Sequence, residues 1–367
     1  MFMGRFALVL VLLTACSTAA APRPATVTPS PTAAAPQYSP PPSRSAFLAV
    51  VGGPKNSSVS LVASDGAVVA TTPVDLAPFR IHALMSWTSA SRTRVYYLNG
   101  GSEVRFLAPD GTTGAVTRIA LGTTEQAGFS VSPDDSKIAV AIFIYTAFPD
   151  ANYTGMRLYV EDLNDGGHHV DIFSSTTVAE FPVGWTNGRL ILAVSNPRCC
   201  RVQPLNPYDA FSYHVVDPAT GTRLAGLCNN SSVPEGPIEP IGAVCSAGGF
   251  APIYQRWDGT TFDAPAAVPN PTQYLNAISP DGTRVAVGQP RIGIWGPLGH
   301  GEELNQSGYV LGWLDENHLV IQQADSPALS VLEIVDSLVA GRLWQLRTIS
   351  EISAEGAYLG TFPAAVT

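Results

Sequence analysis

Charged residues are scarce in this chain, and most of them are acidic. They make up 13% of the 367 residues, and 29 Asp and Glu outnumber 20 Lys and Arg, which gives a net charge of −9. Nucleic acids and anionic lipid surfaces are bound through clusters of basic residues, and the sequence contains no basic run. The composition therefore excludes nucleic-acid binding and purely electrostatic attachment to a membrane from the expected functions.

The apolar run at the N-terminus, Phe6 to Leu13, is too short to cross a membrane. A spanning helix needs about 20 apolar residues. The run follows a single cation, Arg5, and leads to the small residues Thr14 and Ala15. This order of charge, short apolar core and small residues predicts a cleaved export signal over residues 1–15.

Cys16 follows this signal directly. The residues Leu13-Thr14-Ala15-Cys16 resemble the lipobox of bacterial lipoproteins. The resemblance implies that Cys16 is lipidated after cleavage and holds the mature protein on the outer face of a membrane, and acyl chains at about 0.8 kcal/mol per buried methylene would make that attachment stable. The alternative is an ordinary secretory signal with a cysteine at this position by chance.

The segment from Cys16 to residue 45 has almost no apolar residues with a regular spacing. Ala, Pro, Thr and Ser dominate it. Such a segment cannot bury enough apolar area to fold, and its prolines favour an extended, semi-rigid chain. We expect a disordered linker over residues 16–45 and one folded body over residues 46–367.

Cysteine is rare in the body, which has only Cys199, Cys200, Cys228 and Cys245. In an exported protein an even number of cysteines predicts disulfides, and four cysteines allow three connectivities. A bond between the neighbours Cys199 and Cys200 would strain the peptide, which favours separate bonds from these two to Cys228 and Cys245. A four-cysteine zinc site is the alternative, although the spacing lacks paired C-x-x-C motifs.

Helical periodicity is also lacking before the last fifty residues or so, whereas short β-type runs recur throughout. One unit repeats: an apolar strand, a Ser-Pro or Trp, a polar turn, and a second apolar strand. The clearest copies are Phe129–Val140 and Ala277–Val287, which carry Ser-Pro-Asp-Asp and Ser-Pro-Asp-Gly turns. Copies with Trp in place of Ser-Pro surround Trp87, Trp185 and Trp313. These turns predict antiparallel hairpins in an all-β body.

The Ser-Pro-Asp-Gly hairpins, each with its flanking strands, resemble the WD40-like repeats of TolB-type β-propellers. The resemblance implies a β-propeller and, more loosely, a binding role. Counting an earlier unit at Phe47–Thr72 and one around Cys245, the spacing of the units predicts seven blades, with six or eight as alternatives. The tail Ala357–Phe362 has strand composition, and we expect it to complete the first unit.

Catalytic motifs are absent. The sequence has no G-x-S-x-G elbow, and its six histidines form no H-E-x-x-H motif. His168 and His169 follow Gly167 in an expected hairpin turn and are interpreted as solvated turn residues. Asp134 and Asp281 occupy equivalent turn positions and are expected to cap their own turns. We therefore expect no catalytic residue, no metal and no cofactor.

One segment, Asn196–Pro240, interrupts the repeat. It holds three of the four body cysteines and the aromatic residues Tyr208, Phe211 and Tyr213. Loops on rigid scaffolds commonly bind ligands, so a disulfide-pinned aromatic loop could hold a peptide or glycan. The equally acceptable alternative is an insertion that needs disulfides because it has little core of its own.

Anchor, linker and repeat scaffold together predict an extracytoplasmic lipoprotein that binds a protein or cell-envelope polymer without catalysis. The alternative is a hydrolase or lyase acting on envelope glycans or peptides, with its site in the propeller channel. Clustered carboxylates or histidines on the inner strands would favour the enzyme. Small or apolar residues there would favour the binding scaffold.

Overall fold

A computed structural model of the chain describes residues 47–51, 58–63, 68–75, 87–147, 152–195, 210–228, 241–245, 253–261, 276–288, 291–295, 301–303, 307–315, 318–323, 329–333, 345–348 and 357–362. The expected signal peptide, Cys16 and linker lie outside these residues and stay predictions. The chain divides into two compact units, Met1–Gln37 and Tyr38–Thr367, and every described residue belongs to the second. The described residues include no helix long and apolar enough to cross a membrane.

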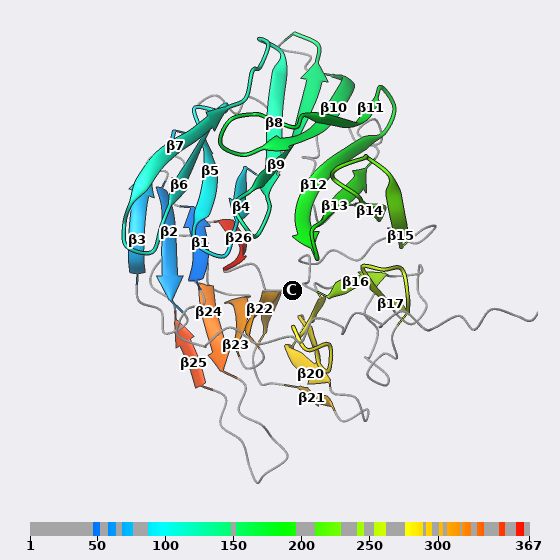
Figure 1. Ribbon diagram of the computed structural model, residues 1–367. Coiled ribbons are helices and arrows are strands. Elements are labelled where there is room, and N and C mark those ends of the chain that lie inside the picture. Colours follow the sequence, from blue (N-terminus) through cyan, green and yellow to red (C-terminus); the bar gives the residue numbers. More distant parts are fainter. Residues whose placement is uncertain are drawn as a thin grey trace, which may run out of the picture. The chain divides into compact units, whose positions relative to one another are not determined.

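The described elements are all β-strands, and they form seven antiparallel sheets in chain order (Figure 1). The first three sheets comprise β1 (Phe47–Val51), β2 (Ser58–Ala63), β3 (Val68–Pro73) and β26 (Ala357–Phe362); β4 (Thr88–Ala90), β5 (Val95–Asn99), β6 (Glu103–Leu107) and β7 (Thr113–Arg118); and β8 (Glu125–Val131), β9 (Lys137–Tyr145), β10 (Tyr153–Asp162) and β11 (Val170–Ser175).

Sheets four to seven continue the same pattern along the chain. They comprise β12 (Ala179–Thr186), β13 (Arg189–Ser195), β14 (Ser212–Val216) and β15 (Arg223–Leu227); β16 (Gly242–Cys245) and β17 (Ile253–Arg256); β18 (Asn276–Ile278), β19 (Val285–Val287), β20 (Gly293–Trp295) and β21 (Gly301–Glu303); and β22 (Gly308–Asp315), β23 (His318–Gln323), β24 (Leu329–Glu333) and β25 (Gln345–Thr348).

The Ser-Pro-Asp turns form the hairpins that the sequence predicted. Ser132 closes the turn between β8 and β9 by donating its backbone N–H to Lys137 at 2.9 Å, and Ser279 donates to Arg284 at 2.8 Å in the turn between β18 and β19. The third residue after each serine has a left-handed backbone, with φ of 61° at Asp135 and 73° at Gly282. Glycine adopts this conformation freely and Asp tolerates it, so both sequences suit the same turn.

The last strand of the chain lies in the first sheet. β26 pairs antiparallel with β1, with Phe362 opposite Phe47 and Ala357 opposite Val51. This is the pairing that the sequence predicted for the tail. β1 therefore has a hydrogen-bonded neighbour on each side, β26 and β2 (Figure 1).

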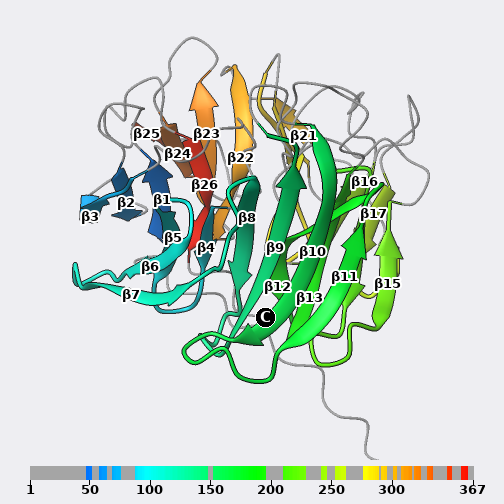
Figure 2. The same cartoon turned by 90° about the horizontal axis from the view of Figure 1, so that it is seen from above.

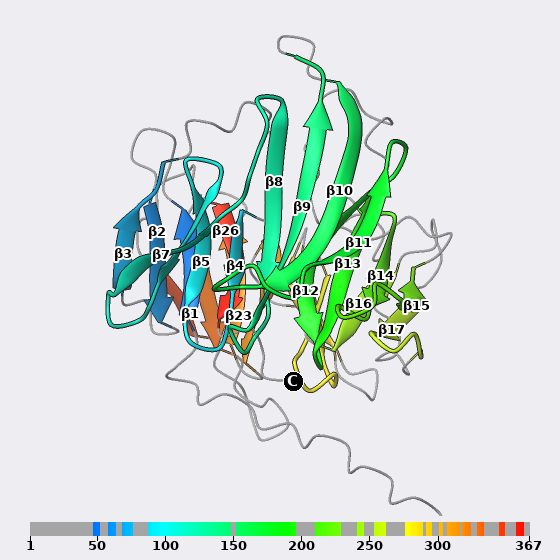
Figure 3. The same ribbon diagram turned by 45° about the horizontal axis from the view of Figure 1, so that its top comes forward.

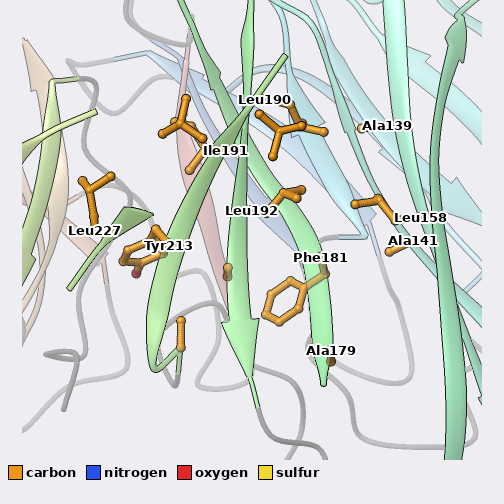
Figure 4. Close-up of a cluster of buried hydrophobic side chains, with 14 of the residues drawn as sticks. Ala139, Ala141, Leu158, Ala179, Phe181, Leu190, Ile191, Leu192, Tyr213 and Leu227 are labelled. Carbon is orange, nitrogen blue, oxygen red and sulfur yellow. The ribbon is translucent and has the colours of Figure 1, made fainter. Parts of the chain in front are cut away.

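Apolar side chains fill the space between neighbouring sheets. In Figure 4, Ala139, Ala141 and Leu158 of the third sheet belong to one buried cluster with Phe181, Leu190 and Leu192 of the fourth. The rings of Phe143 and Phe181 meet edge-on across the same boundary, with centroids 6.2 Å apart. β9 and β10 of the third sheet are nine and ten residues long, and they run side by side in Figures 2 and 3. Alternating strand residues thus supply the core on both faces of a sheet.

Polar contacts also join successive sheets. The Val131 N–H donates to Ser89 Oγ at 2.8 Å, which links sheets two and three. The Trp313 indole N–H donates to the Ala277 carbonyl at 3.1 Å, which links sheets six and seven. The Trp that replaces Ser-Pro in this copy of the repeat therefore contacts the preceding sheet. The seven sheets support the prediction of seven blades, and the blade number itself stays a prediction.

Candidate functional site

Seven strands, one from each sheet, contact an equivalent strand of a neighbouring sheet and are called the inner strands: β4, β8, β12, β16, β18, β22 and β26. Contacts run from β26 to β4, from β4 to β8, from β8 to β12, from β16 to β18, from β18 to β22 and from β22 to β26. Small residues are frequent in these strands, and none of the seven contains Lys, Arg or His. Their carboxylates are Glu125, Glu180 and Asp315.

Glu125 and Glu180 are both engaged by neighbouring groups. Arg157 lies 3.3 Å from Glu125 Oε2, which also accepts the Gly122 N–H at 2.8 Å. The Glu180 side chain is only 5% exposed, and its oxygens lie 3.1 Å from Arg223 and 3.1 Å from His214 Nδ1. His214 Nδ1 makes no hydrogen bond despite this short distance. The hydrogen-bonded ion pair with Arg223 is therefore the contact that stabilises the Glu180 carboxylate.

Their contacts leave Glu125 and Glu180 poorly placed for acid–base catalysis. A pair of carboxylates with separated pKa values is the usual device for hydrolysis of glycans, and it requires two groups that face one substrate. Glu125 and Glu180 belong to different sheets and each is neutralised by its own arginine. Within the described part of the chain, no group of three or more His, Cys, Asp or Glu could hold a metal ion.

His168 and His169 lie on the surface, in and just after the turn between β10 and β11. The His168 side chain is 83% exposed and its Nδ1 lies 2.5 Å from Asp162, which also pairs with Lys137. His169 lies between Glu161 at 3.1 Å and Asp171 at 3.3 Å, and its ring stacks on Tyr159 at 4.6 Å between centroids. Hydrogen bonding to Glu161, and then to Asp171, raises the pKa of His169 above 6.5.

Asp134 and Asp281 cap their own turns, which confirms the interpretation from sequence. Asp134 Oδ1 accepts the Ser132 hydroxyl and the Ser136 hydroxyl, each at 2.7 Å. Asp281 Oδ1 accepts the Ser279 hydroxyl at 2.5 Å and the Thr283 N–H at 2.9 Å. The Ser132 hydrogen bond is the largest cause that lowers the pKa of Asp134, so this carboxyl stays ionised for a structural reason.

The disulfide pairing differs from the one that the sequence favoured. Cys228 bonds Cys245, and the expected bonds from Cys199 and Cys200 to these two are therefore wrong. Cys228 follows the end of β15 and Cys245 ends β16, so the bond joins the fourth sheet to the fifth. Gln255 supports it, because its Oε1 accepts the Cys228 N–H at 2.8 Å and lies 3.3 Å from Cys245 Sγ. Cys199 and Cys200 lie outside the described residues.

The three aromatic residues nominated for binding differ in their exposure to solvent. Phe211 is 47% exposed and is therefore accessible to a ligand. Tyr213, labelled in Figure 4, is 3% exposed and lies within β14, so its assignment to a binding loop is wrong. Its ring meets that of Trp257 edge-on, with centroids 5.7 Å apart. Tyr208 lies outside the described residues. The signal that could have placed Tyr213 in the core is the following Val215-Val216, because Tyr213 to Val216 form one buried strand run.

Sequence reasoning missed the apolar surface residue Ile253, which is 44% exposed. In the fifth sheet Ile253 pairs with Cys245. In the fourth sheet Tyr213 pairs with Leu227, so Phe211 and Cys228 belong to the same end of that sheet. We call Phe211, Ile253 and the Cys228–Cys245 bond the disulfide end. It presents apolar side chains on strands that are covalently fixed to each other, which suits recognition of a partner surface.

The sequence matches no protein family model and no curated protein. Solved structures do resemble the fold. Pyrococcus horikoshii acylaminoacyl peptidase has a TM-score of 0.50 at 9% identity over 85% of this chain and 52% of that chain. A putative TolB from Agrobacterium tumefaciens has a TM-score of 0.37 at 13% identity, over 84% and 90%. Kluyvelomyces marxianus Hsv2 has a TM-score of 0.42 at 12% identity, over 83% and 93%. The seven antiparallel sheets, together with the likeness to the peptidase structure, identify the fold as a β-propeller and go no further.

Proposed function

We propose that this chain is a lipid-anchored extracytoplasmic scaffold whose β-propeller binds a protein or a cell-envelope polymer without catalysing a reaction. The composition of the inner strands carries the proposal. They lack His, Lys and Arg, and Glu125 and Glu180 are each paired with an arginine of their own sheet. Among the inner-strand side chains that the structure describes, this pairing leaves no carboxylate with a facing histidine or second carboxylate for acid–base catalysis, which supports binding without a reaction.

The anchor in this proposal is Cys16, within the lipobox-like residues Leu13-Thr14-Ala15-Cys16. The small number of basic residues supports a lipid anchor, because Lys and Arg are too few to hold this acidic chain on an anionic membrane. Cys16→Ser should remove lipid labelling and release the protein from membranes or leave its signal uncleaved. Continued labelling with radioactive fatty acid in Cys16→Ser would refute the anchor.

The binding surface in this proposal is the disulfide end. Phe211 and Ile253 supply exposed apolar area, and apolar and aromatic groups contribute much of the binding energy in protein interfaces. The covalent bond between Cys228 and Cys245 keeps the two sheets in register, so little ordering would be needed when a partner binds.

The test is crosslinking and pull-down of the anchored protein from its native membrane. A photo-crosslinking residue at position 211 should capture a specific partner, and Phe211→Ala with Ile253→Ala should reduce its recovery by about tenfold. Leu224→Ala is the matched control, because Leu224 is 46% exposed and belongs to the other end of β15 from Cys228. Equal losses in both variants would contradict the assignment to the disulfide end.

The same preparation tests the alternative enzyme. Turnover of an envelope glycan or peptide library by the purified protein, lost in Glu180→Gln, would replace the scaffold with a hydrolase or lyase. Glu180 is the right probe because it is the inner-strand carboxylate that has both a histidine and an arginine within 3.1 Å.

A further inference from the structure

The residues Asn152-Tyr153-Thr154 form a sequon, the pattern Asn-x-Ser/Thr with x other than proline that accepts N-linked glycans in exported proteins. Further sequons in the chain begin at Asn56, Asn229, Asn230 and Asn305. At Asn152 all three residues of the sequon are among those that the structure describes, and at the other positions they are not. Asn152 is therefore the acceptor whose surroundings are known.

Asn152 and Thr154 both face solvent. Asn152 directly precedes β10 and Thr154 is the second residue of that strand; each is exposed, whereas Tyr153 between them is half-buried. The Tyr153 hydroxyl donates to the carbonyls of Ser175 and Val178, at 3.3 and 3.1 Å. Because successive side chains of an extended chain point to opposite sides, the acceptor amide and the hydroxyl of the sequon lie together on the outer side.

The sequon lies at the end of the β9–β10 hairpin, which is directed toward the top of the view in Figure 3. The ladder between the two strands is irregular at this end. Tyr153 pairs with Tyr145. The next pair joins Gly155 to Ile144, so Thr154 has no residue opposite it in β9. A residue left out of the ladder in this way is a β-bulge, and it locally disrupts the strand pairing.

Few hydrogen bonds hold the backbone of Asn152. Its N–H donates to Thr146 Oγ1 at 2.8 Å, and its carbonyl accepts the Thr146 N–H at 2.8 Å. The Thr154 hydroxyl donates to the Ile144 carbonyl at 3.0 Å. Exposed backbone hydrogen bonds at the end of a hairpin open locally at a small cost in free energy. The sequon can therefore leave the strand and enter the active site of a transferase while the rest of the sheet stays folded.

The sequence before Asn152 indicates which class of transferase fits. Asp150 stands two positions before the asparagine, and although it lies outside the described residues its place in the sequence is clear. Bacterial oligosaccharyltransferases recognise a longer sequon with an acidic residue at this place, where a carboxylate can form a charged hydrogen bond with a basic side chain. Among the other sequons, the one at Asn305 has such a residue, Glu303. The longer form agrees with the bacterial lipobox resemblance at the N-terminus.

We propose that Asn152 is an N-glycosylation site and that the glycan comes from an oligosaccharide carried on a polyprenyl diphosphate. The Asn152 Nδ2 forms a bond to C1 of the first sugar while the bond from C1 to the diphosphate oxygen breaks. The amide loses one proton to a base of the transferase, and polyprenyl diphosphate leaves with the bonding electrons. Because Asn152 is exposed, the glycan displaces no buried group. This site rests on the proposed export of the chain, since the carrier presents its glycan outside the cytoplasm.

The test is mass spectrometry of the full chain purified from its native membrane and digested with trypsin. Cleavage after Lys137 and after Arg157 releases the peptide Ile138–Arg157, in which Asn152 is the one asparagine. In the wild type this peptide should carry the added mass of an oligosaccharide. Asn152→Gln and Thr154→Val should each abolish the added mass. Thr154→Ser retains the hydroxyl of the sequon and should retain the glycan.

Asn164 is the matched control in the same digest. It is exposed in the turn after β10, but Asp165 and Gly166 follow it, so no hydroxyl residue completes a sequon. It should carry no glycan. Modification of Asn164 to the same extent as Asn152 would overturn the proposal, because it would show transfer that does not depend on the sequon. A glycan retained on Asn152 in Thr154→Val would overturn it for the same reason.

An unmodified Asn152 in the wild type would overturn the proposal directly. The mass of the intact protein shows separately whether residues 1–15 have been removed and Cys16 lipidated. Removal of these residues together with an unmodified Asn152 would overturn the glycosylation site and leave the proposed export standing. A glycan on Asn152 in a protein that lacks the lipid would support the site and contradict the anchor.

Discussion

At the scale of single residues, Asp135 shows how one side chain joins two sheets. Its Oδ1 accepts the Tyr96 hydroxyl at 2.7 Å and its Oδ2 accepts the Thr93 hydroxyl at 2.6 Å, both from the second sheet or its turn. Burial, followed by the hydrogen bond to Asp135, raises the pKa of Tyr96 well above its usual 10.0, so the hydroxyl remains a donor. The repeat thus uses its turn for contact between sheets as well as for the hairpin.

Asp135→Ala should lower the free energy of unfolding by about 1–3 kcal/mol, because it removes the acceptors of the Tyr96 and Thr93 hydroxyls. Its left-handed backbone, at φ 61°, adds to the cost for Ala. Asp135→Asn tolerates that conformation and keeps one acceptor oxygen, so it should lose less. Urea unfolding of the three proteins checks the order, and an Ala variant as stable as the wild type would contradict it.

The pKa of His169 offers a second test at this scale. We expect an NMR titration to place it above 6.5, because the hydrogen bond to Glu161 favours the protonated ring. A raised pKa in the folded state means that the contact stabilises the fold at pH below about 6.5 and that this contribution is lost as pH rises through the folded-state pKa. Glu161→Gln should lower the His169 pKa more than Asp171→Asn does. An unchanged pKa in both variants would show that the two contacts do not form in solution.

At the scale of elements, the sequence predicted hairpins well and contacts between sheets poorly. The turns after Ser132 and Ser279 depend on residues a few positions apart, and these local rules place β8, β9, β18 and β19 correctly. The disulfide depends on which strand end lies next to which in space. Cys228 and Cys245 meet because β15 and β16 belong to successive sheets, and spacing along the chain does not encode that neighbour relation.

Replacing both Cys228 and Cys245 by Ala should destabilise the protein by about 3 kcal/mol, the value expected for a closed loop of this length. The two cysteines are 17 residues apart. Cys199→Ala with Cys200→Ala is the control and should leave the Cys228–Cys245 bond in place. Peptide mapping of the wild type under non-reducing conditions should recover a linked peptide with these two cysteines. A peptide that links Cys199 to Cys228 would refute the pairing.

At the scale of the whole molecule, the repeat predicted the order of the sheets. Each predicted unit, from Phe47–Thr72 to the copy around Trp313, corresponds to one observed sheet. The candidate binding site was less accessible to sequence reasoning. Phe211 could be nominated from composition, but Ile253 is exposed only because its neighbour Tyr254 is buried in a two-stranded sheet, and this requires the register.

Deletion of Tyr358–Thr367 should lower the melting temperature by about 10 °C or more. It removes β26, the partner of β1, and exposes apolar surface of the first sheet. Deletion of residues 363–367 alone is the control, because it leaves β26 whole, and we expect a much smaller change. Thermal unfolding followed by circular dichroism makes the comparison, and equal melting temperatures for the two deletions would exclude a stabilising role for β26.

The position of β1 has a mechanical consequence. The chain before Phe47 enters the folded body through β1, so any pull on that segment, such as tension on a surface-attached molecule, is applied first to this strand. β1 is paired on both sides, with β26 and with β2. A tensile load is therefore shared by two hydrogen-bonded ladders, whereas an edge strand would peel from one. The C-terminal strand in this way reinforces the point where force on the N-terminal segment enters the fold.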